Sequence, residues 1–574
     1  MLKILKNLSV YKWIVIGIIA LIFTQAMTEL LLPTLMGNIV DNGVVEGDIP
    51  YIWKFGAVML LVAGVSVAVA VAASYYSSKV AMGLGRDLRR KVFTHVEKFS
   101  LQEFDDVGTA SLITRTTNDI TQIQQVVMMM LRMVILAPLM MAGGIIMAFS
   151  KDAKLAMIVL LVLPVLSVAI LLIFKKVLPL FKQVQKRLDK LNLVMRENLT
   201  GIRVIRAFNK ESKEQDRLKT ANTNLTSVSI KVNKIMAFVM PLMMLLMNLT
   251  VVGIIWFGGL RIDGGNMQIG DLMAFIQYVM QILFAVMMAS MMFVIIPRAA
   301  VSAKRVNDVL EMEPVLPDDG TEEANIQPGT LEFDDVTFNY PGAEEPALTH
   351  ISFKARPGET TAIIGGTGSG KSTLINLVPR FFEVTEGAIR VNGVDIRNAS
   401  QRSVREKIGF VPQKALLFTG TVAENIRYGK ADATEEEIKY AAKIAQADNF
   451  IENMQDGYDT LIEQGGTNVS GGQKQRLSIA RALVRKPDIY IFDDSFSALD
   501  YRTDANLRAA LDNETKQATV VIVAQRVSSV IDADQIIVLD HGKMAGIGTH
   551  EELLKDSPVY QEIVKSQLGE EDTA

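Results

Sequence analysis

Apolar residues are distributed unevenly along the 574-residue chain. In residues 1–300 they form six long runs separated by polar or charged stretches, whereas the rest of the chain has only short apolar runs. About 20 apolar residues in a helix are enough to cross the roughly 30 Å hydrocarbon core of a bilayer. The pattern therefore predicts six transmembrane helices, at about residues 14–40, 55–80, 127–149, 154–177, 235–260 and 271–297.

The first apolar run has one feature of a signal peptide, because Lys3 and Lys6 precede it. No clear small-residue cleavage site follows, and five further apolar runs come after it. We therefore interpret the first run as a membrane span that stays in the protein.

Positive charges favour one orientation of these helices. Residues 175–234, between the fourth and fifth runs, carry 15 Lys or Arg, and the loop between the second and third runs is also basic. The alternate loops, such as residues 150–153, are short. Because basic loops stay in the cytoplasm, we expect the N-terminus, both long loops and the second half of the chain there. The pattern predicts a multi-pass protein of the cell membrane.

The two long basic loops have helical periodicity. Residues 109–134 read as one helix that continues into the third apolar run, and residues 178–211 have apolar positions at helical spacing. This predicts helices that extend well beyond the membrane, with turns at Gly108 and Gly201 beside short crossing helices. The alternative is a separate soluble helical hairpin.

Several polar residues lie within the predicted spans, among them Gln25, Glu29, Gln277 and Gln281. Polar side chains inside a membrane often mark a transport pathway, so these residues are candidate substrate contacts. Hydrogen bonding between helices is the alternative interpretation. Met is abundant in the same half, as in residues 243–247, and its flexible side chain suits a surface that accepts several apolar shapes.

The second half of the chain predicts a soluble α/β domain over residues 329–566. A stretch rich in Pro, Gly and acidic residues, 311–328, is expected to link it to a transmembrane domain of residues 1–310, and residues 567–574 are expected to form a disordered tail. The chain has no Cys, which excludes disulfides and thiolate metal sites. Its net charge of −3 gives no basic surface for nucleic acid.

The most specific motif is a phosphate-binding loop between an apolar strand and a helix. Residues 365–372 read GGTGSGKS and match the pattern G-x-x-x-x-G-K-[ST]. Backbone N–H groups of such a loop cradle phosphate oxygens, the Lys adds positive charge, and the Ser hydroxyl ligates Mg²⁺. The predicted nucleotide-binding residues are Gly365, Gly366, Thr367, Gly368, Ser369, Gly370, Lys371, Ser372 and Thr373.

Two adjacent carboxylates, Asp493 and Asp494, follow the apolar strand-like run IYIF. Like charges side by side at the end of a strand are costly unless a cation lies nearby. The position of Asp493 fits the Mg²⁺-holding carboxylate of a nucleotide site, usually acting through water. We therefore expect Ser372 and Asp493 to share one metal ion.

Further motifs resemble those of the ATP-binding cassette exporters, and the resemblance covers essentially the whole chain. Residues 469–473 read VSGGQ, similar to the family signature with Val469 in place of the usual Leu, and residues 497–500 read SALD, similar to the D-loop. The resemblance implies a six-span helical domain, an α/β ATPase domain that binds ATP and Mg²⁺, and a dimer that holds two ATP molecules. It assigns the signature to Ser470, Gly471, Gly472 and Gln473, the D-loop to Ser497 and Asp500, adenine stacking to Tyr340, and Mg²⁺ contact to Gln413.

Two positions depart from the family pattern. Asp494 stands where the family has the general-base Glu, and Gln525 stands where it has a switch His. Asp is shorter by about 1.5 Å, which is large against the hydrogen-bond window of about 2.6–3.2 Å that a base must meet. Gln cannot become a cation. Either change alone is compatible with drift, whereas both together favour a site that binds ATP and hydrolyses it poorly, slowed by on the order of 10²–10⁴.

A site of this kind resembles one half of the bacterial heterodimeric multidrug exporters of the EfrCD and LmrCD type, with this chain as the EfrC-type half. The prediction is therefore an ATP-driven transport ATPase that exports amphipathic or cationic drugs, with a second half-transporter supplying a competent site. The alternatives are export of lipid or peptide, and a regulatory membrane protein that binds ATP without transport.

Overall fold

The computed structural model describes residues 2–316 and 320–568. The chain forms two compact units, one containing residues up to Glu97 and Thr109–Glu313, the other containing Lys98–Gly108 and the chain from Pro314 onward. Residues 317–319 of the predicted linker and 569–574 of the predicted tail lie outside the described residues.

The first unit is helical. Within the described residues, six helical stretches are long and apolar enough to span a membrane: Lys3–Val45, Ile49–Val96, Thr109–Lys151, Ala153–Thr200, Glu211–Asp263 and Ile269–Leu310. The prediction of six spans is confirmed. The α-helices of these stretches are α1 (Leu2–Lys6), α2 (Lys12–Ile39), α3 (Ile49–Val96), α5 (Thr109–Thr114), α6 (Ile120–Met129), α7 (Ile135–Lys151), α8 (Ala153–Thr200), α10 (Glu211–Asp263) and α11 (Ile269–Leu310).

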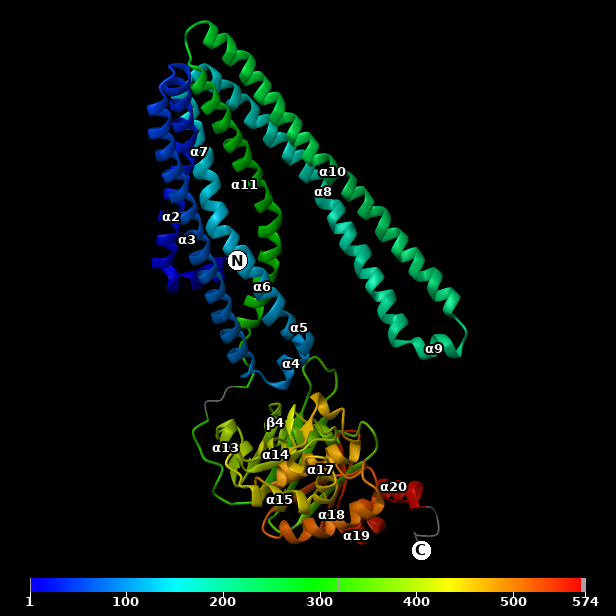
Figure 1. Ribbon diagram of the computed structural model, residues 1–574. Coiled ribbons are helices and arrows are strands. Elements are labelled where there is room, and N and C mark those ends of the chain that lie inside the picture. Colours follow the sequence, from blue (N-terminus) through cyan, green and yellow to red (C-terminus); the bar gives the residue numbers. More distant parts are fainter. Residues whose placement is uncertain (1, 317–319, 569–574) are drawn as a thin grey trace. The chain divides into compact units, whose positions relative to one another are not determined.

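The long basic loops are continuations of these helices. α8 has 48 residues and α10 has 53, which at 1.5 Å per residue is about 72–80 Å, more than twice the hydrocarbon core. The two helices run side by side and are joined at one end by the short helix α9 (Ile202–Ala207), directly after Gly201 (Figure 1). The second short helix, α4 (Leu101–Val107), ends at Gly108, whose φ is +77°. The predicted extended helices are confirmed, and the separate soluble hairpin is wrong.

Specific polar contacts fix the helices of the first unit. Tyr278 of α11 is fully buried and donates a 3.0 Å hydrogen bond to the carbonyl of Leu30 in α2. Asp152, at the start of α8, accepts hydrogen bonds of 2.8 and 2.6 Å from the guanidinium of Arg261 near the end of α10. These contacts hold α2 against α11 and close the α8–α10 pair.

The second unit is an α/β domain, as predicted. Its described strands form a six-stranded sheet in the order β12-β11-β3-β10-β9-β6, a four-stranded sheet in the order β2-β1-β4-β5, and the pair β7-β8. The strands are β1 (Leu331–Phe338), β2 (Leu348–Ala355), β3 (Thr360–Gly365), β4 (Glu386–Val391), β5 (Val394–Asp395), β6 (Ile408–Val411), β7 (Gly420–Thr421), β8 (Leu461–Ile462), β9 (Ile489–Asp493), β10 (Thr519–Val523), β11 (Gln535–Asp540) and β12 (Lys543–Gly548). The helices are α12 (Lys371–Leu377), α13 (Gln401–Glu406), α14 (Val422–Arg427), α15 (Glu435–Ile444), α16 (Asp448–Glu452), α17 (Gly471–Leu483), α18 (Tyr501–Glu514), α19 (His550–Asp556) and α20 (Pro558–Leu568).

The register of the six-stranded sheet determines where the site lies. β3, β10, β9 and β6 are parallel neighbours, and Val523 at the end of β10 pairs with both Ile363 of β3 and Asp493 of β9. Ligands of open parallel sheets bind at the carboxyl ends of the strands. The phosphate loop, the paired carboxylates and the segment after β10 therefore leave the sheet at one edge.

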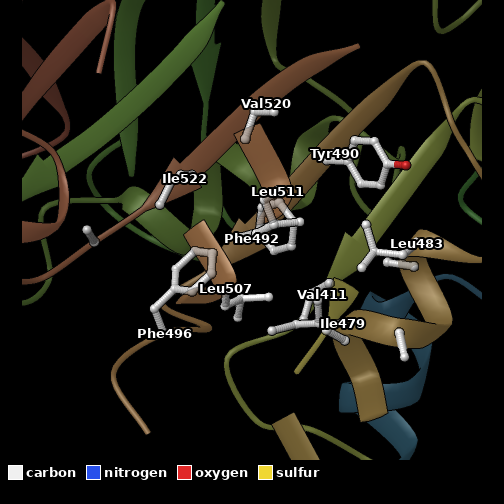
Figure 2. Close-up of a cluster of buried hydrophobic side chains, with 14 of the residues drawn as sticks. Val411, Ile479, Leu483, Tyr490, Phe492, Phe496, Leu507, Leu511, Val520 and Ile522 are labelled. Carbon is white, nitrogen blue, oxygen red and sulfur yellow. The ribbon is translucent and has the colours of Figure 1, made fainter. Parts of the chain in front are cut away.

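A buried apolar cluster holds this edge in place (Figure 2). Phe492 of β9 is fully buried in this cluster. Ile479 and Leu483 of α17 and Leu507 of α18 belong to the same cluster. Phe496, in the turn after the two carboxylates, lies 5.3 Å from the Phe492 ring. Burial of one such aromatic side chain stabilises a fold by about 1.5–3 kcal/mol. The cluster therefore holds α17, whose N-terminus is the predicted signature, against β9, which ends at the predicted Mg²⁺ ligand.

Candidate nucleotide-binding and transport sites

The phosphate loop leaves β3 at Gly365 and enters α12 at Lys371. Gly368 and Gly370 have φ of +84° and +97°, a region that glycine enters without steric cost. Nothing lies within 4 Å of the positions that Cβ atoms on Gly366 and Gly368 would occupy, so this side of the loop has room for phosphate. The Nζ of Lys371 donates 2.8 Å hydrogen bonds to the carbonyls of Gly365 and Gly366. Burial lowers the pKa of Lys371, and the nearby carboxylates oppose this shift.

The predicted metal ligands lie together beside this loop. The Ser372 hydroxyl donates a 3.3 Å hydrogen bond to Asp493 Oδ1. Asp493 is 7 % exposed, and burial raises its pKa, with the charge of Asp494 adding to the shift. A cation would offset this desolvation, and hydroxyl, carboxylate and amide oxygens are ligands that Mg²⁺ accepts. The residues therefore fit Mg²⁺, which Ser372, Asp493 and Gln413 would hold and which would neutralise phosphate charge when bound.

Asp494 is held by two amides. Gln525 Nε2 donates a 2.8 Å hydrogen bond to Asp494 Oδ2, and Gln413 Nε2 donates a 3.2 Å hydrogen bond to the same oxygen. A carboxylate oxygen offers about two lone-pair sites, and both on Oδ2 are therefore used. The structure thus brings together Gln413, Asp494 and Gln525, which were expected at one site from separate parts of the sequence.

Tyr340 lies next to the phosphate-loop helix. Its hydroxyl is 3.1 Å from Thr373 Oγ1, and its ring packs edge-on against Phe338 and Phe382 with centroids 4.8 and 5.4 Å away. The side chain is half-buried, so part of it is accessible to a nucleotide base. Its stacking on adenine stays a prediction.

The predicted signature is the exposed N-terminus of α17. Ser470 Oγ accepts a 3.3 Å hydrogen bond from the Gln473 N–H, and Gln473 Oε1 accepts a 2.8 Å bond from the Ser470 N–H. Nothing lies within 4 Å of where a Cβ on Gly471 would be. A helix N-terminus with its N–H groups open to solvent attracts anions. This end of the 13-residue helix is thus accessible to a phosphate from outside the subunit.

The predicted D-loop joins the signature to the two carboxylates. A Cβ on Gly472 would lie 3.3 Å from the Ala498 carbonyl, so the signature and the D-loop are adjacent. The Ser497 hydroxyl donates a 2.9 Å hydrogen bond to the Asp494 carbonyl, and Asp500 caps α18 by accepting a 3.0 Å bond from the Thr503 N–H.

Comparison with known proteins identifies the family. The family model of the ABC transporter transmembrane region matches residues 14–287 of the sequence, and the family model named ABC transporter matches residues 348–497. An uncharacterized ABC transporter ATP-binding protein of Mycobacterium tuberculosis is 45 % identical over 567 residues, which covers 98 % of this chain and 97 % of that protein. The chain is an ABC exporter half-transporter. Its ATPase domain implies ATP binding.

Two further comparisons describe the relatives of this exporter. An ATP-dependent lipid A-core flippase of Desulfotalea psychrophila is 35 % identical over 493 residues, covering 85 % of each chain. The solved structure of a bacterial Atm1-family ABC exporter with ATP bound superposes with a TM-score of 0.81 at 26 % identity, covering 98 % of this chain and 99 % of that one. The fold of this exporter is therefore the ABC exporter fold, as predicted.

A cavity of about 460 Å³ lies within the helical unit of the exporter. It is formed by α2, α7, α10 and α11, and its lining includes Glu29, Gln281, Phe284, Met140, Met247, Met280 and Met288. Among the described residues that line it, Glu29 is the one charged side chain. The cavity is therefore mainly apolar and flexible, with a single carboxylate.

The predicted intramembrane polar residues differ in position. Gln25 donates a 2.9 Å hydrogen bond to Glu29 Oε1. Gln281 donates a 3.3 Å bond to the Glu29 carbonyl, so this side chain hydrogen-bonds between helices and also lines the cavity. Gln277 is exposed and is not part of the cavity lining.

Sequence reasoning missed Gln567, which it assigned to a disordered tail, whereas α20 continues to Leu568. Its side chain contacts the backbone of the segment that carries Gln525. A single Gln 42 residues downstream, outside any motif, gives no sequence signal for this contact. The methionines of the cavity were visible only as a local enrichment, because the fold decides which of them face inward.

Proposed function

We propose that this exporter is one subunit of a heterodimeric, ATP-driven multidrug efflux transporter, and that its own ATP site binds nucleotide but hydrolyses it poorly. The observation that carries the proposal is the pair of amide hydrogen bonds on Asp494 Oδ2. A general base must accept a proton from the attacking water. The hydrogen bonds from Gln413 and Gln525 use the lone pairs of Oδ2 and fix the carboxylate, so Oδ1 alone is left to act as base, on a side chain about 1.5 Å shorter than the family's Glu.

The residues expected to bind nucleotide lie together in the same site. The phosphate loop, Lys371, Ser372 and Asp493 lie together with room for phosphate and with oxygen ligands for a metal ion. Gln525 is a hydrogen-bond donor without the charge that the family's His supplies. Retained binding with impaired hydrolysis fits a regulatory ATP site in a two-site transporter.

The exposed signature supports a second chain. Ser470 and Gly471 present the N-terminus of α17 to the outside of the subunit, where the ATP of another subunit would bind. Two copies of this chain would form two impaired sites. A partner with Glu and His at the corresponding positions would give the transporter one competent site, completed by this chain's signature.

The cavity supports apolar cations as cargo. Methionine side chains adapt to different shapes, and Glu29 supplies one negative charge. A relative bears the name lipid A-core flippase, so lipid export is the second candidate. The described lining has no basic residue to attract an anionic headgroup, which favours the cationic cargo. We expect the membrane orientation that the basic loops predict, with the ATPase domain in the cytoplasm.

The proposal is tested by separating binding from hydrolysis in the full-length transporter. Mg²⁺-dependent ATP binding to this chain should be lost in Lys371→Ala and kept in Asp494→Asn. Steady-state hydrolysis should change little in Asp494→Asn. Loss of hydrolysis in Asp494→Asn to the level of Lys371→Ala would contradict the proposal.

A further inference from the structure

The segment after β10 is tied to the C-terminal helix by one side chain. Gln567 Nε2 donates a 2.8 Å hydrogen bond to the carbonyl of Gln525, and Gln567 Oε1 accepts a 2.8 Å hydrogen bond from the N–H of Val527. The amide thus contacts the backbone on both sides of Arg526. Two opposed hydrogen bonds fix position and orientation together, which one bond does not do.

The helix that carries Gln567 is itself well anchored. Tyr560 and Val564 of α20 are 0 % and 1 % exposed, and the Tyr560 hydroxyl is 2.7 Å from His550 Nδ1 of α19. Gln567 lies one turn beyond Val564, on the same α-helix. The contact therefore connects the switch segment, residues 525–529, to a rigid support.

The opposite end of the switch segment has a second support. Arg508 of α18 donates a 2.7 Å hydrogen bond to the carbonyl of Ser529. Between the two supports, Gln525 and Arg526 are exposed and face a polar cavity of about 480 Å³ that Asp494, Ser497, Ser528 and Gln567 also line. The pairing with β3 ends one residue earlier, where the Ala524 N–H donates a 3.1 Å hydrogen bond to the Ile363 carbonyl. Beyond that point, Gln567 holds the carbonyl of Gln525.

We propose that Gln567 is a positioning residue for the ATP site. By holding the backbone of Gln525, it keeps the Gln525 amide at Asp494. The proposed function places Asp494 in the position of the base, which faces the terminal phosphate of ATP. α20 thereby sets how strongly the site distinguishes ATP from ADP. The inference needs only that the site binds nucleotide, and it holds whether or not the site hydrolyses ATP.

The test compares affinities for ATP and ADP in the full-length transporter. Competition of Mg·ATP and Mg·ADP against a photoreactive ATP analogue reports both affinities on this chain. Gln567→Ala is expected to weaken the affinity for ATP about threefold to tenfold, the scale of one or two net hydrogen bonds. The affinity for ADP should change by less than about twofold. The matched control is Gln561→Ala on the same helix, whose side chain contacts the carbonyls of Leu554 and Lys555 and should change neither affinity.

A double-mutant cycle separates positioning from general stability. In the Gln525→Ala background, Gln567→Ala should add less than about twofold to the ATP affinity, because the side chain it positions is gone. Gln567→Glu keeps the acceptor for the Val527 N–H and loses the donor to the Gln525 carbonyl. It should therefore also weaken the affinity for ATP more than the affinity for ADP. Equal weakening of ATP and ADP, unchanged ATP affinity in both Gln567 variants, or an undiminished effect in the Gln525→Ala background would overturn the proposal.

Discussion

Gln525 Nε2 lies 2.8 Å from Asp494 Oδ2 and donates a hydrogen bond to it. Gln525 follows β10 and Asp494 follows β9, and the register between these strands brings the two residues together. Gln413, which follows β6 on the other side of β9, donates to the same oxygen. Asp494 is therefore held between two neutral amide donors, one from the segment after each strand that flanks β9.

Restoring the family's residues should restore hydrolysis only when both are restored. We expect Asp494→Glu combined with Gln525→His to raise hydrolysis at this site by about 10²-fold or more, within the range of general-base catalysis. Asp494→Glu alone should give less than about a tenfold gain, because the Gln525 amide still binds the carboxylate. Single-turnover cleavage of γ-labelled ATP by this chain measures both. Full recovery in Asp494→Glu alone would show that Gln525 has no part in the impairment.

The signature should matter more for turnover than the chain's own acid. In the proposed heterodimer, Ser470 would serve the partner's competent site, so Ser470→Ala should lower steady-state hydrolysis by about tenfold or more. Asp494→Asn should change it by less than about twofold. The measurement is the ATPase rate of the assembled transporter in lipid. Equal losses in the two variants would instead indicate two equivalent sites.

Mg²⁺-dependent binding of ATP should be sensitive to acid. Burial raises the pKa of Asp493, so this carboxylate takes up a proton at a higher pH than an ordinary aspartate. The protonated form is a poor cation ligand, and the Mg²⁺-dependent part of ATP affinity should therefore fall as the pH is lowered from neutral. Titration of ATP affinity with and without Mg²⁺ measures this. Asp493→Asn should not show this fall in affinity at low pH. A fall that persists in Asp493→Asn would assign the effect to another titrating group.

Glu29 should select for positive charge in the cargo. In vesicles or cells, Glu29→Gln is expected to lower efflux of a lipophilic monocation by about fivefold or more and to spare a neutral dye of similar size, because one desolvated charge contact is lost. Glu29→Asp, which keeps the charge, is the matched control and should retain most of the efflux. Unchanged cation efflux in Glu29→Gln would remove Glu29 from the cargo site.

The sequence predicted the parts of the fold that depend on local pattern. Six apolar runs predicted six spans because hydrophobic periodicity is a property of short segments, and the turn expected at Gly201 lies directly before α9. The phosphate loop was predictable for the same reason, since eight adjacent residues determine its shape.

Contacts between distant segments were not predictable. That both Gln413 and Gln525 donate to one oxygen of Asp494 depends on strand order and register, which the strand sequences do not encode locally. The contact of Gln567 with the switch segment depends on how α20 packs on the finished domain. Gln277 and Gln281 were both candidate substrate contacts, yet only Gln281 is among the residues that line the cavity, because the packing of α11 against its neighbours decides which side chains reach it.

The most direct measurement is the fate of ATP bound to this chain. The purified full-length chain is loaded with Mg·ATP, freed of excess nucleotide, and incubated for many turnover times of a typical exporter before the bound nucleotide is extracted. Intact ATP should predominate on the wild-type chain and on Asp494→Asn alike, with no nucleotide retained by Lys371→Ala. Conversion of the bound ATP to ADP that is abolished by Asp494→Asn would contradict the impaired site.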